Sequence, residues 1–226
     1  MFAAARGHGA TPLGDEPVTY DVLARDLAAL ADAHGATRAL GVSMGAGALL
    51  SLLAADPGRF ERVVLFLPAA LDAPRGDAAA RRTAALAAAL ERRDREAVAA
   101  CVAAELPGDL GAPAAAYVRA RTSFLLASPG VAAVLRALPA QAPVPDRTAL
   151  SAVTAQVLVL AQEGDDLHPA QLSRELAGVL PHARLVVFDR PGAVFRERAR
   201  LRDEVVGFLD GPDPTAPTAG AVGRDG

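Results

Sequence analysis

The sequence predicts an α/β fold, in which helices flank a mostly parallel β-sheet. Short runs rich in Val, Leu and Phe alternate along the chain with amphipathic stretches of helical period, as in parallel-sheet proteins. Most of these runs are apolar almost throughout, which is typical of strands buried on both faces. The chain has 226 residues, 52% of them apolar, and is therefore long enough for one such domain with its own core.

Four runs qualify as strands, and helices are predicted between them. The strands are expected at residues 39–42, 62–67, 156–160 and 184–188, with a weaker candidate at 2–5. Thr19 can cap the first helix, and Pro169 can open a later one. The spacing of apolar residues from Leu201 to Leu209 marks the last helix.

The stretch between the second and third strands has no strand pattern. Asp77 can begin an Ala-rich helix there, and the spacing of Val98, Val102 and Leu106 indicates another. We therefore expect a core formed by residues 1–67 and 156–209, with residues 68–155 inserted as a helical lid over one end of the sheet. Residues 210–226 are rich in Pro, Gly and Asp without apolar periodicity, and a disordered tail is predicted for them.

Composition narrows the classes of function. The net charge of −3 gives no electrostatic case for a nucleic-acid partner. No apolar run approaches the ~18 residues of a membrane-spanning helix, so no membrane partner is expected and a cytoplasmic location is the default. All 23 basic residues are arginine, which excludes Schiff-base chemistry on lysine. The single cysteine, Cys101, excludes an internal disulfide and a cysteine-based zinc site.

The most informative segment is Gly41-Val42-Ser43-Met44-Gly45, a G-x-S-x-G pattern between a predicted strand and a predicted helix. A sharp strand-to-helix turn strains the backbone of the serine, and only small residues fit two places before and after it. The turn projects the Ser43 hydroxyl above the carboxyl end of the sheet, and the Met44 N–H points to where an oxyanion would develop. The pattern predicts a nucleophilic serine. The alternative interpretation is a Gly-rich turn with a capping serine.

An ordered series of motifs around Ser43 resembles the α/β-hydrolase superfamily. The series contains Arg6-Gly7-His8-Gly9, Tyr20-Asp21, the Gly41 to Gly45 pattern, Pro57 with Arg59-Phe60, and Val63 to Leu67; the likeness resumes at Val157 to Pro169 and extends to Leu209. Lid-bearing esterases and lactonases are the most similar in general form. The resemblance implies an acyl-enzyme on Ser43 followed by hydrolysis, with a small ester, lactone or related acyl compound as substrate and with no cofactor or metal.

The resemblance also places the acid of a catalytic triad. The family has this acid on the loop after the next-to-last strand, usually four residues before a proline. In the loop of residues 162–169 that position is Asp165, and Asp166 is the alternative. A carboxylate there would hold an imidazole in one tautomer and stabilise its charged form.

The triad histidine of the family has no counterpart at its usual place after the last strand. Ala193 stands there, and no histidine follows His182. Without an imidazole the serine hydroxyl has no group to accept its proton, so the sequence predicts feeble hydrolysis or none. His168 is the one substitute base, on the condition that its imidazole lies within about 3.5 Å of the Ser43 hydroxyl. The competing hypothesis is a binding or non-hydrolytic protein that keeps the fold.

Members of the family usually have further strands before the point that corresponds to the start of this sequence. They include the strand beside the one that leads to Ser43, and the loop that gives a second oxyanion N–H. Either the native protein is longer, with Met1 a misplaced start, or the sheet is rearranged. In both cases the strand leading to Ser43 is expected to expose one edge or to pair with residues 2–5.

Overall fold

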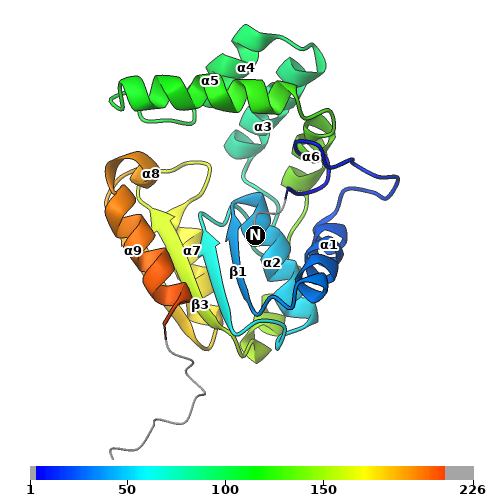
Figure 1. The fold of residues 1–226 in the computed structure, drawn as a ribbon, viewed down its shortest axis with the longest axis vertical. Coiled ribbons are helices and arrows are strands. Elements are labelled where there is room, and N and C mark those ends of the chain that lie inside the picture. The colour runs from blue at the N-terminus through cyan, green and yellow to red at the C-terminus, as the bar shows by residue number, and fades with distance from the viewer. Residues whose placement is uncertain (1–3, 212–226) are drawn as a thin grey trace, which may run out of the picture.

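A computed structural model describes residues 4–211, in which helices cover both faces of a parallel sheet (Figure 1). The described sheet has the order β1-β2-β3-β4 with every pair parallel. Its strands are β1 (Arg38–Val42), β2 (Arg62–Phe66), β3 (Gln156–Gln162) and β4 (Ala183–Phe188). The predicted fold class and all four strands are confirmed. Ala4 and Ala5 form no strand, and the rest of the weak candidate at 2–5 lies outside the described residues, as does all but the start of the predicted tail.

Helices connect the strands and fill the long interval between β2 and β3. They are α1 (Tyr20–Ala33), α2 (Met44–Ala55), α3 (Asp77–Glu91), α4 (Arg95–Ala103), α5 (Ala112–Leu126), α6 (Val131–Ala137), α7 (Ala170–Val179), α8 (Ala193–Arg196) and α9 (Arg198–Leu209), with short 3-10 helices η1 (Leu138–Ala140) and η2 (Arg147–Ala152). Thr19 caps α1 as predicted, because its hydroxyl accepts a hydrogen bond from the Val22 N–H at 3.2 Å. Pro169 immediately precedes α7, also as predicted.

Apolar clusters lie on both faces of the sheet. On one face, α1, α2 and α7 pack against Val63, Leu65, Val157 and Val159. On the other face, α9 covers a second cluster formed by Val64, Phe66, Leu158, Leu160 and Phe188. Successive side chains of a strand point to opposite faces, so burial of both faces explains the unbroken apolar runs of β2 and β3.

The interval between β2 and β3 is helical, as expected, and α3, α4 and α5 lie over the carboxyl ends of the strands (Figure 1). It has its own apolar cluster, which includes Leu86, Val98 and Leu125. Within the predicted insertion of 68–155, the side chains of Val144, Leu150, Val153 and Ala155 pack into the core beside the sheet. In residues 4–211 no single helix is long and apolar enough to cross a membrane, and α5 with residues 131–140 passes that test only as a pair bent by 95°.

The strand that leads to Ser43 lies at an edge of the described sheet. Within residues 4–211, β1 pairs with β2 on one side and has no strand on the other. Leu40 and Val42 are 46% and 48% exposed, which is unusual for large apolar side chains in a parallel sheet. The exposed, apolar edge is the one that the sequence predicts.

Candidate active site

Ser43 occupies the tight turn between β1 and α2. Its φ of 50° lies in the left-handed region, which strains any residue other than glycine. The turn brings two backbone segments so close that a Cβ on Gly41 would lie 2.7 Å from the Ala46 nitrogen and closer still to the Gly45 carbonyl. Position 41 therefore requires glycine, and Ser43 stands at the tip of a strand-to-helix elbow, as the motif predicts.

The second glycine of the motif has a different role. The sequence suggests that Gly41 and Gly45 are both confined by neighbouring backbone, yet a Cβ on Gly45 would meet nothing within 4 Å. The carbonyl group of Gly45 packs against the α-carbon of Gly41. The expectation of a steric requirement at Gly45 is therefore wrong, because the space beside its α-carbon is open.

The structure brings Ser43, His168 and Asp165 together. The Nε2 atom of His168 lies 2.9 Å from the Ser43 Oγ, inside the limit set from the sequence. Its Nδ1 atom lies 3.0 Å from the Asp165 Oδ2. When Nδ1 bears the proton and donates a hydrogen bond to the carboxylate, Nε2 is left free to accept the proton of the serine hydroxyl. The imidazole and the carboxylate come from one loop, three residues apart, between β3 and α7.

The backbone of this loop folds around the Asp165 carboxylate. Its Oδ1 atom accepts hydrogen bonds from the N–H groups of Leu167 at 2.9 Å and His168 at 3.1 Å. Such an Asx turn bends the chain back on itself, so the His168 ring can reach the other carboxylate oxygen. Asp166, the alternative acid, has a side chain that is 76% exposed and lies 3.6 Å from Arg82. Of the two candidate acids, Asp165 is the one that is hydrogen-bonded to His168.

The surroundings keep Asp165 ionised. Burial acts to raise its pKa, but the hydrogen bond and charge of His168, together with the Gln162 amide and the Leu167 N–H, outweigh burial and lower the pKa from 3.8 to about 2. A carboxylate that is charged at neutral pH can orient the imidazole and stabilise it once it has accepted a proton.

This lowered pKa predicts acid-sensitive stability. A carboxyl whose pKa is depressed by folding stabilises the protein above its unfolded-state pKa, and that contribution is lost as the pH falls through its folded-state value. For Asp165 the window runs from about pH 4 to about pH 2, and the contribution is about 2 kcal/mol. The free energies of unfolding in urea of the wild type and of Asp165→Asn are expected to differ by this amount near pH 7 and to become equal in acid. The exposed Asp166→Asn is the control, and a difference independent of pH would contradict the assignment.

Gln162 occupies the gap between this loop and the place where the resemblance implies a histidine. Its amide Nε2 donates to the Asp165 Oδ2 at 2.7 Å, and its Oε1 accepts the N–H groups of Gly192 at 3.0 Å and Ala193 at 3.2 Å. Ala193 itself is buried at the start of α8. Sequence reasoning missed Gln162, although a polar residue at the carboxyl end of the apolar run from Val157 to Ala161 is a signal that could have found it.

Two further groups face the serine. Met44 begins α2, so its N–H lies in the first turn, where the helix itself provides no acceptor. Arg75, which the sequence analysis did not select, donates a hydrogen bond from Nη2 to the Ser43 Oγ at 3.3 Å. Both are groups that can interact with negative charge beside the nucleophile.

The other histidines have contacts elsewhere. The ring of His8 lies 3.3 Å from the Arg6 carbonyl, and burial lowers the pKa of His8. His34 ends α1, and the His182 carbonyl accepts a hydrogen bond from Val157 next to β4. Of the four histidines in the chain, His168 alone is hydrogen-bonded to Ser43.

Solved structures provide the comparison for this arrangement. No family model and no curated protein matches the chain. Its structure is similar to an enol-lactonase from Burkholderia xenovorans LB400, with 26% identity, a TM-score of 0.74, and coverage of 91% of this chain and 78% of the other. A hydrolase from Pseudomonas aeruginosa PA01 gives 29% identity, a TM-score of 0.70 and coverage of 91% and 77%.

An esterase from Rhodococcus sp. ECU1013 has the same fold at 23% identity, with a TM-score of 0.70 and coverage of 92% and 78%. These likenesses extend over both the sheet and the helical insertion, because they cover more than nine-tenths of the chain. The parallel sheet and the serine elbow agree with these likenesses. The chain is a member of the α/β-hydrolase superfamily.

Proposed function

We propose that this protein is a serine hydrolase that cleaves a small ester or lactone through an acyl-enzyme on Ser43. One observation carries the proposal: His168 is hydrogen-bonded to both other groups, with its Nε2 at 2.9 Å from the Ser43 Oγ and its Nδ1 at 3.0 Å from the Asp165 Oδ2. The solved structures most relevant to substrate class are an esterase and an enol-lactonase, both of which act on an acyl–oxygen bond. A small molecule of that class is therefore the proposed substrate.

The proposed mechanism follows from the order of these groups. The Ser43 oxygen attacks the carbonyl carbon while its proton passes to the His168 Nε2, and the carbonyl π electrons move onto the oxygen. Asp165 stabilises the resulting imidazolium. Collapse of the tetrahedral intermediate expels the alkoxide, which takes the proton from His168. Water then repeats the sequence on the acyl-enzyme and releases the acid. The Met44 N–H is a proposed donor to the oxyanion.

The helical insertion has a role in the proposal as a lid. Its helices α3, α4 and α5 lie over the carboxyl ends of the strands (Figure 1), and Ser43 directly follows the carboxyl end of β1. A cover in this position would limit the entry of water and the size of the substrate. The competing hypothesis of a non-hydrolytic protein depends on the absence of a base. The 2.9 Å contact between the His168 Nε2 and the Ser43 Oγ favours the hydrolase over that hypothesis.

The proposal is tested by Ser43→Ala. The wild type is expected to hydrolyse p-nitrophenyl acetate and a small enol-lactone, and Ser43→Ala is expected to lower kcat by about 10⁴-fold or more, because acyl-enzyme formation is lost. Ser151→Ala is the matched control, since Ser151 is exposed and bonds only the Thr148 carbonyl. A wild type without turnover, or turnover that survives in Ser43→Ala, would contradict the proposal.

A further inference from the structure

Arg75 contacts the nucleophile from the loop between β2 and α3. Its Nη2 donates to the Ser43 Oγ at 3.3 Å, while the His168 Nε2 lies 2.9 Å from the same oxygen. A serine hydroxyl has one proton and two lone pairs. Because the proton is directed to His168, the contact with Arg75 uses a lone pair. The guanidinium therefore lies beside the reacting oxygen without competing with the base.

The Arg75 guanidinium forms no ion pair with the part of the chain that the structure describes. Among residues 4–211, no acidic group lies within ion-pair distance of Arg75, and Asp165 is already bonded to His168 and Gln162. Tyr20, Glu105 and Asp165 act on Arg75 only from farther away, and burial, the largest influence, lowers its pKa. A cation that is partly buried and unpaired is stabilised by any anion that arrives beside it.

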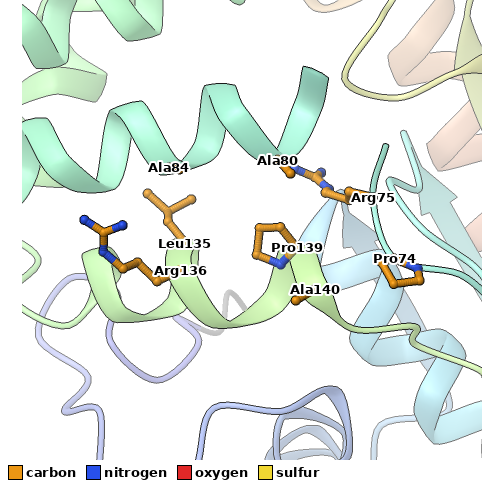
Figure 2. Close-up of a pocket in the computed structure, with 8 residues that line it drawn as sticks. All are labelled: Pro74, Arg75, Ala80, Ala84, Leu135, Arg136, Pro139 and Ala140. Atoms are coloured by element: carbon orange, nitrogen blue, oxygen red, sulfur yellow. The ribbon is translucent and has the colours of Figure 1, made fainter. Parts of the chain in front are cut away.

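The position of Arg75 is fixed by the fold around it. Its backbone N–H donates to the Pro139 carbonyl at 3.0 Å, which ties this loop to η1. Its side chain forms one end of a cavity of about 270 Å³ between α3 and the α6–η1 segment, and Arg136 stands at the other end (Figure 2). The remaining lining residues are apolar: Pro74, Ala80, Ala84, Leu135, Pro139 and Ala140.

The two arginines of this cavity differ in their partners. Arg136 forms two hydrogen bonds of 2.7 Å with the Glu91 carboxylate, so its charge is satisfied. Arg75 has no carboxylate partner among the described residues, and its Nη2 donates to Ser43. The apolar residues that line this cavity also reduce the solvent screening of the Arg75 charge.

We propose that Arg75 is a catalytic residue whose guanidinium stabilises the oxyanion of the tetrahedral intermediate. The inference rests on the proposed acyl transfer. When the Ser43 oxygen bonds to the carbonyl carbon, the carbonyl electron pair moves to an oxygen two bonds away from the atom that Arg75 already contacts. The guanidinium then donates to this oxygen together with the Met44 N–H. It supplies a second donor to the oxyanion, in addition to the Met44 N–H.

The test compares Arg75→Met, Arg75→Lys and the matched control Arg136→Met on a neutral ester, p-nitrophenyl acetate, and an anionic one, mono-p-nitrophenyl succinate. Arg75→Met is expected to lower kcat by about 10²–10³-fold on both esters with little change in KM, as for the loss of one oxyanion donor. Arg75→Lys is expected to have a kcat about tenfold higher than that of Arg75→Met, because lysine keeps the positive charge. Arg136→Met is expected to remain within about twofold of the wild type.

Three outcomes would overturn the inference. A rise in KM confined to the anionic ester, with kcat on acetate unchanged, would make Arg75 a substrate-carboxylate binder instead. Equal activity of the Met and Lys variants, both folded by circular dichroism and thermal unfolding, would make its role structural. A wild type without turnover, or turnover that persists in Ser43→Ala, would overturn the proposed function and the inference with it. This outcome is distinguishable from the first two because it is seen without any change at Arg75.

Discussion

His168→Ala is expected to lower kcat for ester hydrolysis by about four to six orders of magnitude, a loss comparable to that of Ser43→Ala. The imidazole is the group that accepts the Ser43 proton, with Nε2 at 2.9 Å from Oγ. Within the described residues no other histidine bonds Ser43, and the family's usual position is occupied by Ala193. Steady-state kinetics on p-nitrophenyl acetate measure the loss directly.

His34→Ala is the matched control for this experiment. His34 is exposed at the end of α1, and its removal is expected to change kcat by less than about twofold. Thermal unfolding of both variants separates loss of chemistry from loss of fold. Robust turnover in His168→Ala would mean that the base lies elsewhere, and the proposed triad would be wrong.

Gly41→Ala is expected to destabilise the protein by about 3 kcal/mol and to abolish most activity. The added Cβ would overlap the Gly45 carbonyl and lie 2.7 Å from the Ala46 nitrogen. These are backbone atoms, which cannot rotate aside as a flexible side chain can. The turn must then shift, which moves the Ser43 oxygen away from the His168 Nε2. Urea unfolding and ester kinetics measure the two effects.

Gly45→Ala separates a true steric effect from a general effect of replacing glycine. Its Cβ would meet nothing within 4 Å, and it lies in the first turn of α2. Alanine favours a helix over glycine by about 0.5–1 kcal/mol, so this variant is expected to be unchanged or slightly stabilised. Equal destabilisation by the two substitutions would contradict the asymmetric elbow described above.

The sheet and the serine elbow could be predicted because their signals are local. Each strand is a short apolar run, and the G-x-S-x-G pattern joins β1 to α2. The sequence predicts a helical insertion but locates only two helices in it, from Asp77 and around Val98 to Leu106, so α5 is not predicted individually. Pro113 lies at the start of α5, where the N–H that proline lacks has no helical acceptor in any case.

The catalytic contacts could be predicted only in part. His168 and Ser43 are 125 residues apart, and they meet because parallel strands β1 and β3 end at the same edge of the sheet. Sequence spacing places His168 beside Asp165, but it does not measure the reach of the ring. Arg75 is one of many arginines in the chain, and only the packing of its loop against η1 distinguishes it.

Covalent labelling with a fluorophosphonate, followed by intact mass and peptide mapping, tests the central claim most directly. The proposed triad predicts one adduct on Ser43 in the wild type, with a labelling rate that falls by about 10³-fold or more in His168→Ala and is unchanged in His34→Ala. No adduct in the wild type, an adduct on another residue, or labelling of Ser43 at an equal rate without His168 would contradict it.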